Sequence, residues 1–174
     1  FTTDVTKIPE PSSEFQSMLS SGHPVIPIID PGVKLDPEYA VYQSGKVADI
    51  FCQNPEGDDY IGLVWPGLTV FPDFSRADAR DWWAGQVAEF AKLGILGAWL
   101  DMNDPSVGKS NPYDMLWGEG GALPHRTFHS QYAAGMAKAT REGFQKAHPD
   151  ERIFLLTRSN YTGGGKYAAV WTGD

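Results

Sequence analysis

Four short apolar runs in this chain each end on a polar or charged residue, and stretches with helical spacing lie between them. The runs cover residues 25–30, 94–101, 153–158 and 167–174. Continuous apolar runs without alternation favour parallel strands that are buried on both faces. Strands that alternate with helices predict an α/β fold built on a parallel sheet.

Three stretches between the runs are predicted as helices, over residues 13–20, 76–93 and 129–147. The second is the clearest, because Trp83, Val87 and Ala91 fall on one face. We expect Ser75 to cap this helix and Asp78 to complete a capping box.

The polar residues at the strand ends favour a barrel over other α/β folds. In a (β/α)8 TIM barrel the active site lies at the C-terminal ends of the strands, so we predict part of such a barrel with about four strand–helix units. Residues 31–74 and 103–126 lack clear periodicity and are predicted as long, irregular active-site loops. A doubly wound sheet is the alternative, although the chain lacks the glycine-rich phosphate loop that this fold favours.

The length of the chain bears on its domain organisation. A full barrel needs eight strands and roughly 250 residues, whereas this chain has 174. We therefore expect residues 1–174 to be part of a catalytic barrel domain in a larger, multidomain enzyme.

Composition argues against several classes of partner. The formal net charge of −8 opposes nucleic-acid binding, which requires a basic surface. No apolar run approaches the roughly 20 residues of a membrane span. The single cysteine, Cys52, excludes an internal disulfide and a cysteine-rich zinc site, and a buried thiol is its expected state. No particular oligomeric state is predicted.

Three carboxylates, Asp30, Asp101 and Asp174, stand at the ends of predicted strands. Glycoside hydrolysis uses two carboxyl groups beside the scissile bond, one ionised and one protonated. A helix cap or a turn is the ordinary role of a single aspartate after a strand. Three aspartates in equivalent places favour a shared site instead.

Large aromatic residues and one cation stand beside these carboxylates. Core packing is the ordinary role of Trp65, Trp99 and Trp171, but their places beside polar strand ends favour stacking on sugar faces. Arg158 ends a buried strand, where an unpaired charge is costly. We therefore expect Arg158 to have a carboxylate partner or a ligand hydroxyl.

Two metal sites are weaker hypotheses. Asp101 and Asp104 could bind a hard cation, but such a site needs roughly six or more oxygen ligands. His125 and His129 have the spacing of a zinc pair on a helix. A third ligand is not evident, so packing or surface positions are favoured for both histidines.

The segment Trp99-Leu100-Asp101-Met102-Asn103-Asp104-Pro105-Ser106 resembles the nucleophile signature of glycoside hydrolase family 31, the α-glucosidase family, which reads Trp-x-Asp-Met-Asn-Glu-Pro-Ser. Five other segments resemble blocks of the same family in the right order: 28–31, 64–67, 71–74, 157–159 and 170–174. One departure is visible, because Asp104 stands where the family usually has Glu.

The resemblance implies a retaining exo-α-glucosidase that hydrolyses terminal α-linked glucose from oligosaccharides without a metal or organic cofactor. Asp101 would be the nucleophile and Asp174 the general acid/base. Asp30 and Arg158 would hydrogen-bond hydroxyls of the non-reducing glucose. The walls of the pocket would be Trp65, Trp99, Met102 and Trp171. The alternatives are an α-xylosidase or α-glucan lyase of the same family, or a catalytically silent sugar-binding subunit.

Overall fold

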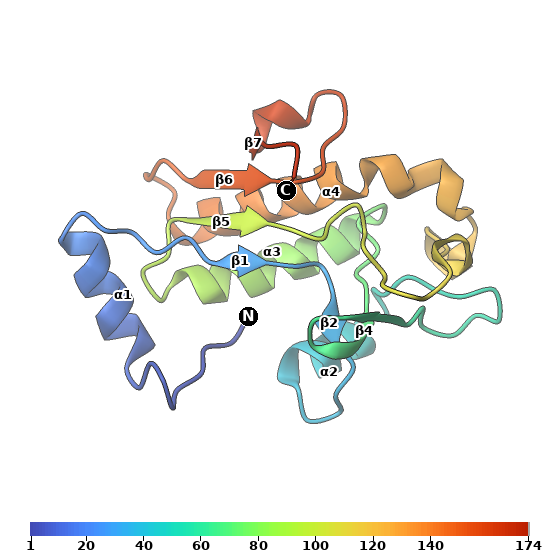
Figure 1. Ribbon diagram of the computed structural model, residues 1–174, viewed down its shortest axis with the longest axis horizontal. Coiled ribbons are helices and arrows are strands. Elements are labelled where there is room, and N and C mark those ends of the chain that lie inside the picture. The colour runs from blue at the N-terminus through green and yellow to red at the C-terminus, as the bar shows by residue number, and fades with distance from the viewer. Residues whose placement is uncertain (174) are drawn as a thin grey trace.

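A four-stranded parallel sheet forms the centre of the protein (Figure 1), in a computed structural model that describes residues 1–173. The order of the strands is β1–β5–β6–β7, and each neighbouring pair is parallel. The strands are β1 (Ile28–Ile29), β5 (Gly97–Leu100), β6 (Phe154–Thr157) and β7 (Ala169–Val170). Each lies within an apolar run identified in the sequence, so the predicted parallel α/β fold is confirmed.

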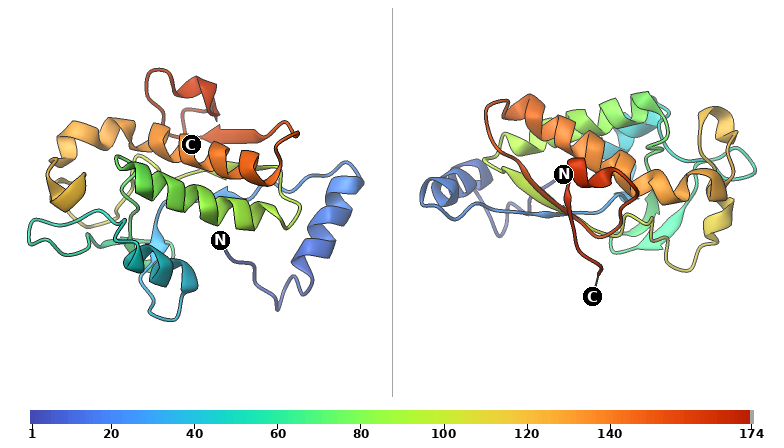
Figure 2. Two further views of the ribbon diagram at one scale, coloured as in Figure 1. Left: turned by 180° about the vertical axis from the view of Figure 1, so that it is seen from behind. Right: turned by 90° about the horizontal axis from the view of Figure 1, so that it is seen from above.

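Two long helices cover one face of this sheet (Figure 2), α3 (Ala77–Ala91) and α4 (His125–Ala147). An added Cβ at Gly143 of α4 would lie 2.6 Å from the Ala84 carbonyl oxygen of α3, so the helices cross closely. Trp83 of α3 donates a hydrogen bond of 2.9 Å from Nε1 to Thr140 Oγ1 of α4. The interface between the two helices forms much of the core.

The predicted helix boundaries need two corrections. Helix α1 (Pro11–Ser20) and helix α4 both begin before the predicted positions. A proline stands at each start, at position 11 in the first turn of α1 and at position 124 as the N-cap residue of α4. The fixed φ of proline suits a helix start, which the apolar spacing alone does not reveal.

The predicted cap of α3 is wrong. Arg76 is the N-cap residue, and no side chain caps the helix. Ser75 Oγ donates instead to the buried carboxylate of Asp73, and Asp78 forms an ion pair of 2.6 Å with Arg76. The carboxylate of Asp73 also accepts from the Gly118 N–H, so it ties the start of α3 to the loop after β5.

The segment 31–74 is more regular than predicted. It contains helix α2 (Ala40–Val47) and an antiparallel sheet of order β2–β4–β3. The strands of this sheet are β2 (Val33–Lys34), β3 (Gly62–Val64) and β4 (Gly67–Val70). Gly67 has a φ of 99°, so Trp65-Pro66-Gly67 closes a tight hairpin. Pro66 and Gly67 thus mark a turn between two strands of a segment that was predicted to be irregular.

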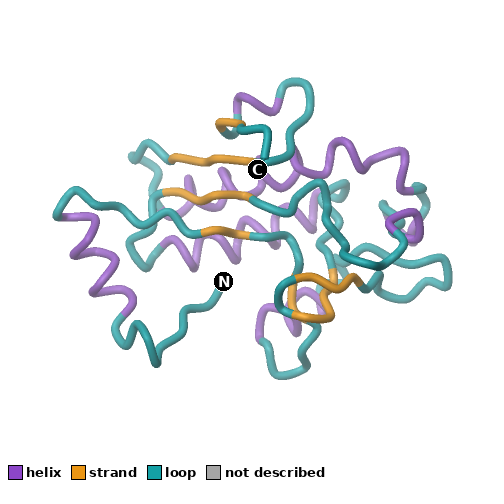
Figure 3. The backbone as a smooth tube through the Cα atoms, viewed as in Figure 1, coloured by secondary structure: helices purple, strands orange, loops and turns teal. Residues whose placement is uncertain are grey.

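The segment 103–126 matches its prediction more closely. Apart from the start of α4, its only regular elements are the short 3-10 turns Pro112–Asp114 and Glu119–Gly121. A third 3-10 turn, Gly164–Lys166, lies between β6 and β7. Figure 3 shows how much of the chain beyond the ends of β1 and β5 is loop.

The face of the parallel sheet opposite α3 and α4 is open in the described residues. Ile28 and Phe154 on this face are 56% and 51% exposed. The next residues, Ile29 and Leu155, point to the helix face and are buried, because successive strand residues alternate between the faces. Burial of these strands on both faces, as predicted, is therefore wrong for residues 1–173.

Two expectations from composition can be compared with the fold. Cys52 is buried, as predicted, and burial raises the pKa of its thiol well above the ordinary value. Within residues 1–173, none of the helices combines the length and the apolar character that crossing a membrane requires.

Candidate active site

The polar residues that follow β1, β5 and β6 lie at one edge of the sheet. Asp101 N–H donates to the Ile29 carbonyl of β1, and Arg158 N–H donates to the Leu100 carbonyl of β5. Parallel pairing therefore continues to Asp101 and Arg158, the last residues of their runs. Asp30, Asp101 and Arg158 consequently stand next to one another at the carboxyl ends of three adjacent strands.

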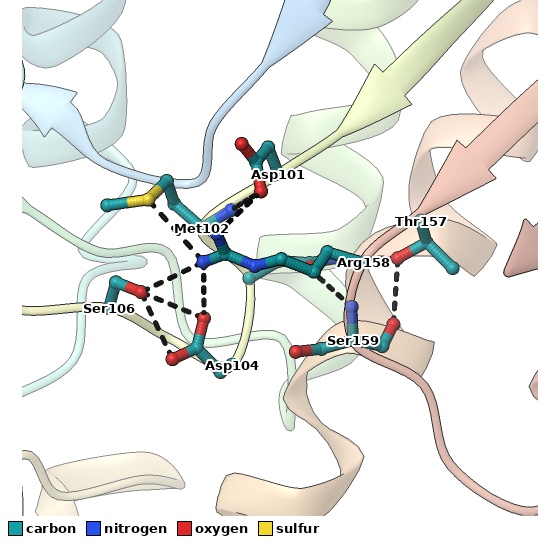
Figure 4. Close-up of polar contacts among 8 residues, drawn as sticks. Asp101, Met102, Asp104, Ser106, Thr157, Arg158 and Ser159 are labelled. Carbon is teal, nitrogen blue, oxygen red and sulfur yellow. Dashed lines mark hydrogen bonds and ion pairs between the residues drawn. The ribbon is translucent and has the colours of Figure 1, made fainter. Parts of the chain in front are cut away.

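Asp101 is held by two contacts to one of its oxygens (Figure 4). Its Oδ1 accepts from the Met102 backbone N–H at 2.8 Å and lies 3.1 Å from Arg158 Nη1. Met102 has a φ of 55°, a left-handed conformation that is uncommon for a residue other than glycine. The backbone turn at Met102 thus brings its N–H to the carboxylate that precedes it.

Arg158 has further partners on the loop that follows β5. Its Nη2 lies 3.1 Å from Asp104 Oδ1, 3.2 Å from Ser106 Oγ and 3.5 Å from Met102 Sδ. The expectation that Arg158 has a carboxylate partner is confirmed. Both carboxylates of the alternative cation site, Asp101 and Asp104, are ion-paired with this guanidinium instead.

A buried asparagine joins the loops after β5 and β6. Asn103 Nδ2 donates to Thr157 Oγ1 at 2.9 Å, and Asn103 Oδ1 accepts from the Ser159 N–H at 3.2 Å. Neither Asn103 nor Ser106 has a role predicted from the sequence. In the sequence, the only indication of a role was that side chains able to hydrogen-bond follow directly after the strand-end carboxylate. Their partners could not be predicted, because they lie more than 50 residues further along the chain.

Asp30 stands beside the Asp101–Arg158 ion pair and makes no direct hydrogen bond to either residue. Its Oδ1 is buried and has no hydrogen-bond partner among the described residues. Burial raises the pKa of the Asp30 carboxyl, the negative charge of Asp101 raises it further, and Arg158 opposes both effects.

Replacing Asp30 by Asn is expected to stabilise the fold at neutral pH. Because the folded-state pKa is raised, the folded protein binds the Asp30 proton more tightly than the unfolded chain does, and stability falls as pH rises between the two pKa values. Because Asp30 is only partly buried and water screens its charge, the gain in the free energy of unfolding at pH 7 should be below about 1 kcal/mol. The gain should shrink towards acidic pH, as measured by urea denaturation at a series of pH values.

Asp36 provides the matched control, because hydrogen bonding to Lys34 lowers the pKa of its carboxyl. Asp36→Asn should therefore show the opposite pH dependence, with stability lost at neutral pH and little changed in acid. A gain for Asp30→Asn that did not vary with pH would contradict the charge-based explanation.

The three tryptophans named from the sequence occupy different environments. Trp99 and Trp171 meet edge to face, with ring centroids 5.2 Å apart, and Trp99 Nε1 is buried without a partner among the described residues. Trp65 is 83% exposed at the turn of the β3–β4 hairpin. It lines a cleft of about 630 Å³ with Met102 and Ser106. Asp174, the remaining strand-end residue, lies outside the described residues.

The histidine pair proposed as an alternative zinc site is part of an aromatic cluster. The His125 and His129 rings stack with centroids 5.0 Å apart, and Trp117 lies 5.5 Å from His125. His125 is buried, and burial lowers its pKa. Within residues 1–173, no three His, Cys, Asp or Glu side chains are placed to hold a metal ion together.

The arrangement suits one kind of chemistry. Asp101 is a carboxylate with one oxygen fixed by a cation and a backbone N–H, and aromatic residues lie at the neighbouring strand ends. A fixed carboxylate can attack an electron-poor carbon, and aromatic faces bind the apolar faces of sugars.

Comparison with known proteins points to one family. Residues 1–174 match the family model described as the glycosyl hydrolases family 31 TIM-barrel domain. The chain is 42% identical to alpha-glucosidase 2 of Bacillus thermoamyloliquefaciens, over 100% of this chain and 23% of that protein. The chain thus spans about a quarter of the length of this relative.

Solved structures agree with the sequence comparison. A family 31 alpha-glucosidase from Bacteroides thetaiotaomicron superposes with a TM-score of 0.79 at 35% identity, over 99% of this chain and 28% of that one. A glucosidase II alpha subunit superposes with a TM-score of 0.84 at 29% identity, over 95% of this chain and 19% of that one. The expected barrel architecture is thereby confirmed, and the chain belongs to the TIM-barrel domain of glycosyl hydrolase family 31.

Proposed function

We propose that this chain carries the reacting part of a retaining exo-α-glucosidase, and that residues 1–174 are part of the catalytic barrel of a larger, multidomain enzyme. The observation that carries the proposal is the fixed carboxylate of Asp101, held by Arg158 at the end of a central strand. The α-glucosidase names of the relatives support the same activity.

The proposed reaction is a double displacement. Asp101 Oδ2 attacks the anomeric carbon of the terminal glucose, while the carboxyl of Asp174 gives its proton to the departing glycosidic oxygen. A glycosyl ester forms on Asp101 as the bond to the leaving group breaks. Water then attacks the same carbon, Asp174 takes the proton from that water, and Asp101 is released as a carboxylate. Two inversions restore the original α configuration.

The remaining site residues would bind the sugar. Asp30 Oδ1 is a buried acceptor and Trp99 Nε1 a buried donor, and both lack partners among the described residues. Buried polar atoms of this kind are normally hydrogen-bonded, so sugar hydroxyls are suitable partners. Arg158 would donate to another hydroxyl. The walls of the pocket would be formed by Trp65, Trp99, Met102 and Trp171.

The same residues are compatible with two alternative kinds of function. An α-xylosidase or α-glucan lyase would share the Asp101 nucleophile, and the Val64-Trp65-Pro66-Gly67 block favours a glucosidase over a xylosidase by resemblance. A silent sugar-binding subunit is disfavoured, because such a protein has no need of an oriented Asp101–Arg158 pair.

The full-length enzyme should hydrolyse p-nitrophenyl α-glucoside, and the first glucose released should be the α anomer, as followed by NMR before mutarotation. The α-xyloside should be the poorer substrate. Initial release of β-glucose would contradict the retaining mechanism. A dehydrated keto sugar as product would identify a lyase, and inactivity on both substrates would favour the silent subunit.

A further inference from the structure

The contacts of Arg158 divide its two terminal nitrogens between different partners. Among residues 1–173, Nη1 has one partner, Asp101 Oδ1, at 3.1 Å. Nη2 serves the following loop, with Asp104 Oδ1 at 3.1 Å and Ser106 Oγ at 3.2 Å. Figure 4 shows the guanidinium between these groups. The guanidinium of Arg158 thus lies between two carboxylates, Asp101 on one side and Asp104 on the other.

This sharing is not the arrangement that an arginine and a carboxylate favour by themselves. A guanidinium commonly pairs with one carboxylate through two parallel hydrogen bonds, which would occupy both oxygens of Asp101. Here Asp101 Oδ1 receives both the Arg158 and the Met102 contacts. No hydrogen bond from residues 1–173 reaches Asp101 Oδ2. Arg158 Nη2 lies against Asp104 and Ser106 instead of the second Asp101 oxygen.

Ser106 has the geometry to hold Nη2 in this position together with Asp104. Its hydroxyl donates to the Asp104 carboxylate, at 2.9 and 3.0 Å from the two oxygens, and accepts from Arg158 Nη2. A hydroxyl has one proton and two lone pairs, so both uses are compatible. The Ser106 N–H also donates to the Met102 carbonyl at 2.9 Å, which fixes the loop that carries the hydroxyl.

The ion pair alone would hold Arg158 weakly. The Asp104 side chain is 52% exposed, and exposed ion pairs contribute little because water screens them. The Ser106 hydroxyl adds a directional partner for both charged groups. The three side chains form one connected group, in which loss of any member loosens the other two.

We propose that Asp104 and Ser106 act as positioning residues that hold Arg158 Nη2 and thereby keep Asp101 Oδ2 free to attack the sugar. The inference rests on the proposed function, because it concerns the same nucleophile. Asp104 and Ser106 do not touch the reacting atoms, and they act through Arg158.

The test uses the full-length enzyme and p-nitrophenyl α-glucoside. Ser106→Ala should lower kcat by about 10-fold, the effect of one lost hydrogen bond to a charged group, with KM changed by less than about 3-fold. Asp104→Asn should lower kcat by a similar or larger factor. Ser106→Thr, which keeps the hydroxyl, and Asp104→Glu, which keeps the charge, should both recover most of kcat. The thermal unfolding midpoint of each variant shows that it is folded.

The double variant Asp104→Asn/Ser106→Ala separates a shared role from two independent ones. Residues that act as a unit give non-additive losses, so the double variant should be no more than about 3-fold slower than Asp104→Asn. Ser130→Ala, at an exposed position on α4, is the control and should leave kcat and KM unchanged.

Three results would overturn the inference: wild-type kcat in Ser106→Ala, equal losses in Ser106→Ala and Ser106→Thr, or losses that multiply in the double variant. A wild-type enzyme inactive on α-glucosides would instead remove the proposed function. The failure of one proposal is therefore distinguishable from the failure of the other.

Discussion

Replacing Asp101 by Asn is expected to lower kcat of the full-length enzyme by about 10⁴-fold, the order of loss that follows removal of a central group in a nucleophilic site. An amide has nearly the same shape as the carboxylate but cannot form the glycosyl ester. The substitution also removes the negative partner of Arg158 Nη1. The measurement is the initial rate on p-nitrophenyl α-glucoside, with the thermal unfolding midpoint recorded in parallel.

Asp58→Asn is a suitable control, because Asp58 is an exposed aspartate on the loop between α2 and β3. It should leave kcat unchanged. Activity of Asp101→Asn within about 10-fold of wild type, in a protein that unfolds at the same temperature, would remove Asp101 as the nucleophile, since a factor of ten is only about 1.4 kcal/mol of barrier.

Replacing Trp83 by Ala should cause the largest loss of stability among single changes in the core. Trp83 is 1% exposed, and its ring meets Phe1 and Phe74 edge to face at centroid distances of 4.8 and 5.2 Å. Its Nε1 also donates to Thr140. Truncation to Ala leaves a large cavity between α3 and α4 and removes this bond, at a cost of about 3–5 kcal/mol. Urea denaturation measures the loss.

Trp65→Ala is the matched control for this prediction. It removes the same side chain from a position that is 83% exposed, so the free energy of unfolding should change by no more than about 0.5 kcal/mol. Its effect should fall on substrate binding, if Trp65 walls the pocket as proposed. Equal destabilisation by the two substitutions would show that the core described around Trp83 does not limit stability.

Much of the fold followed from local patterns. The apolar runs located the four parallel strands, and the spacing of Trp83, Val87 and Ala91 located the buried face of α3. The antiparallel sheet in 31–74 was missed, because Pro66 and Gly67 are equally typical of an irregular loop and of a hairpin turn. Only pairing with β4, a tertiary contact, distinguishes the two.

The site residues at the strand ends were predictable from the same apolar runs, whereas the loop contacts were not. Asp30, Asp101 and Arg158 each follow an apolar run, and parallel pairing necessarily brings such positions to one edge of the sheet. The Ser106 contact was not predictable, because it depends on the left-handed turn at Met102 and on the path of the loop that follows. The exposure of Trp65 likewise depends on the hairpin that carries it.

The open face of the parallel sheet carries a row of apolar residues next to the strand-end site. Ile28 pairs with Trp99, and Trp99 pairs with Leu156, so these three residues form a row across the sheet. Asp30, Asp101 and Arg158 each come two positions later, and strand residues two apart point to the same face. The row therefore lies on the same face of the sheet as the three charged residues and directly precedes them along the strands.

If a sugar ring binds over this row, as proposed, the size of the three side chains sets the depth at which the ring lies. A bulkier or smaller side chain at Ile28 or Leu156 changes the depth of the surface without altering the residues that would hydrogen-bond the ligand. Variation at these two apolar positions among related enzymes should therefore follow the size of the sugar that they accept, as well as the packing of the interior.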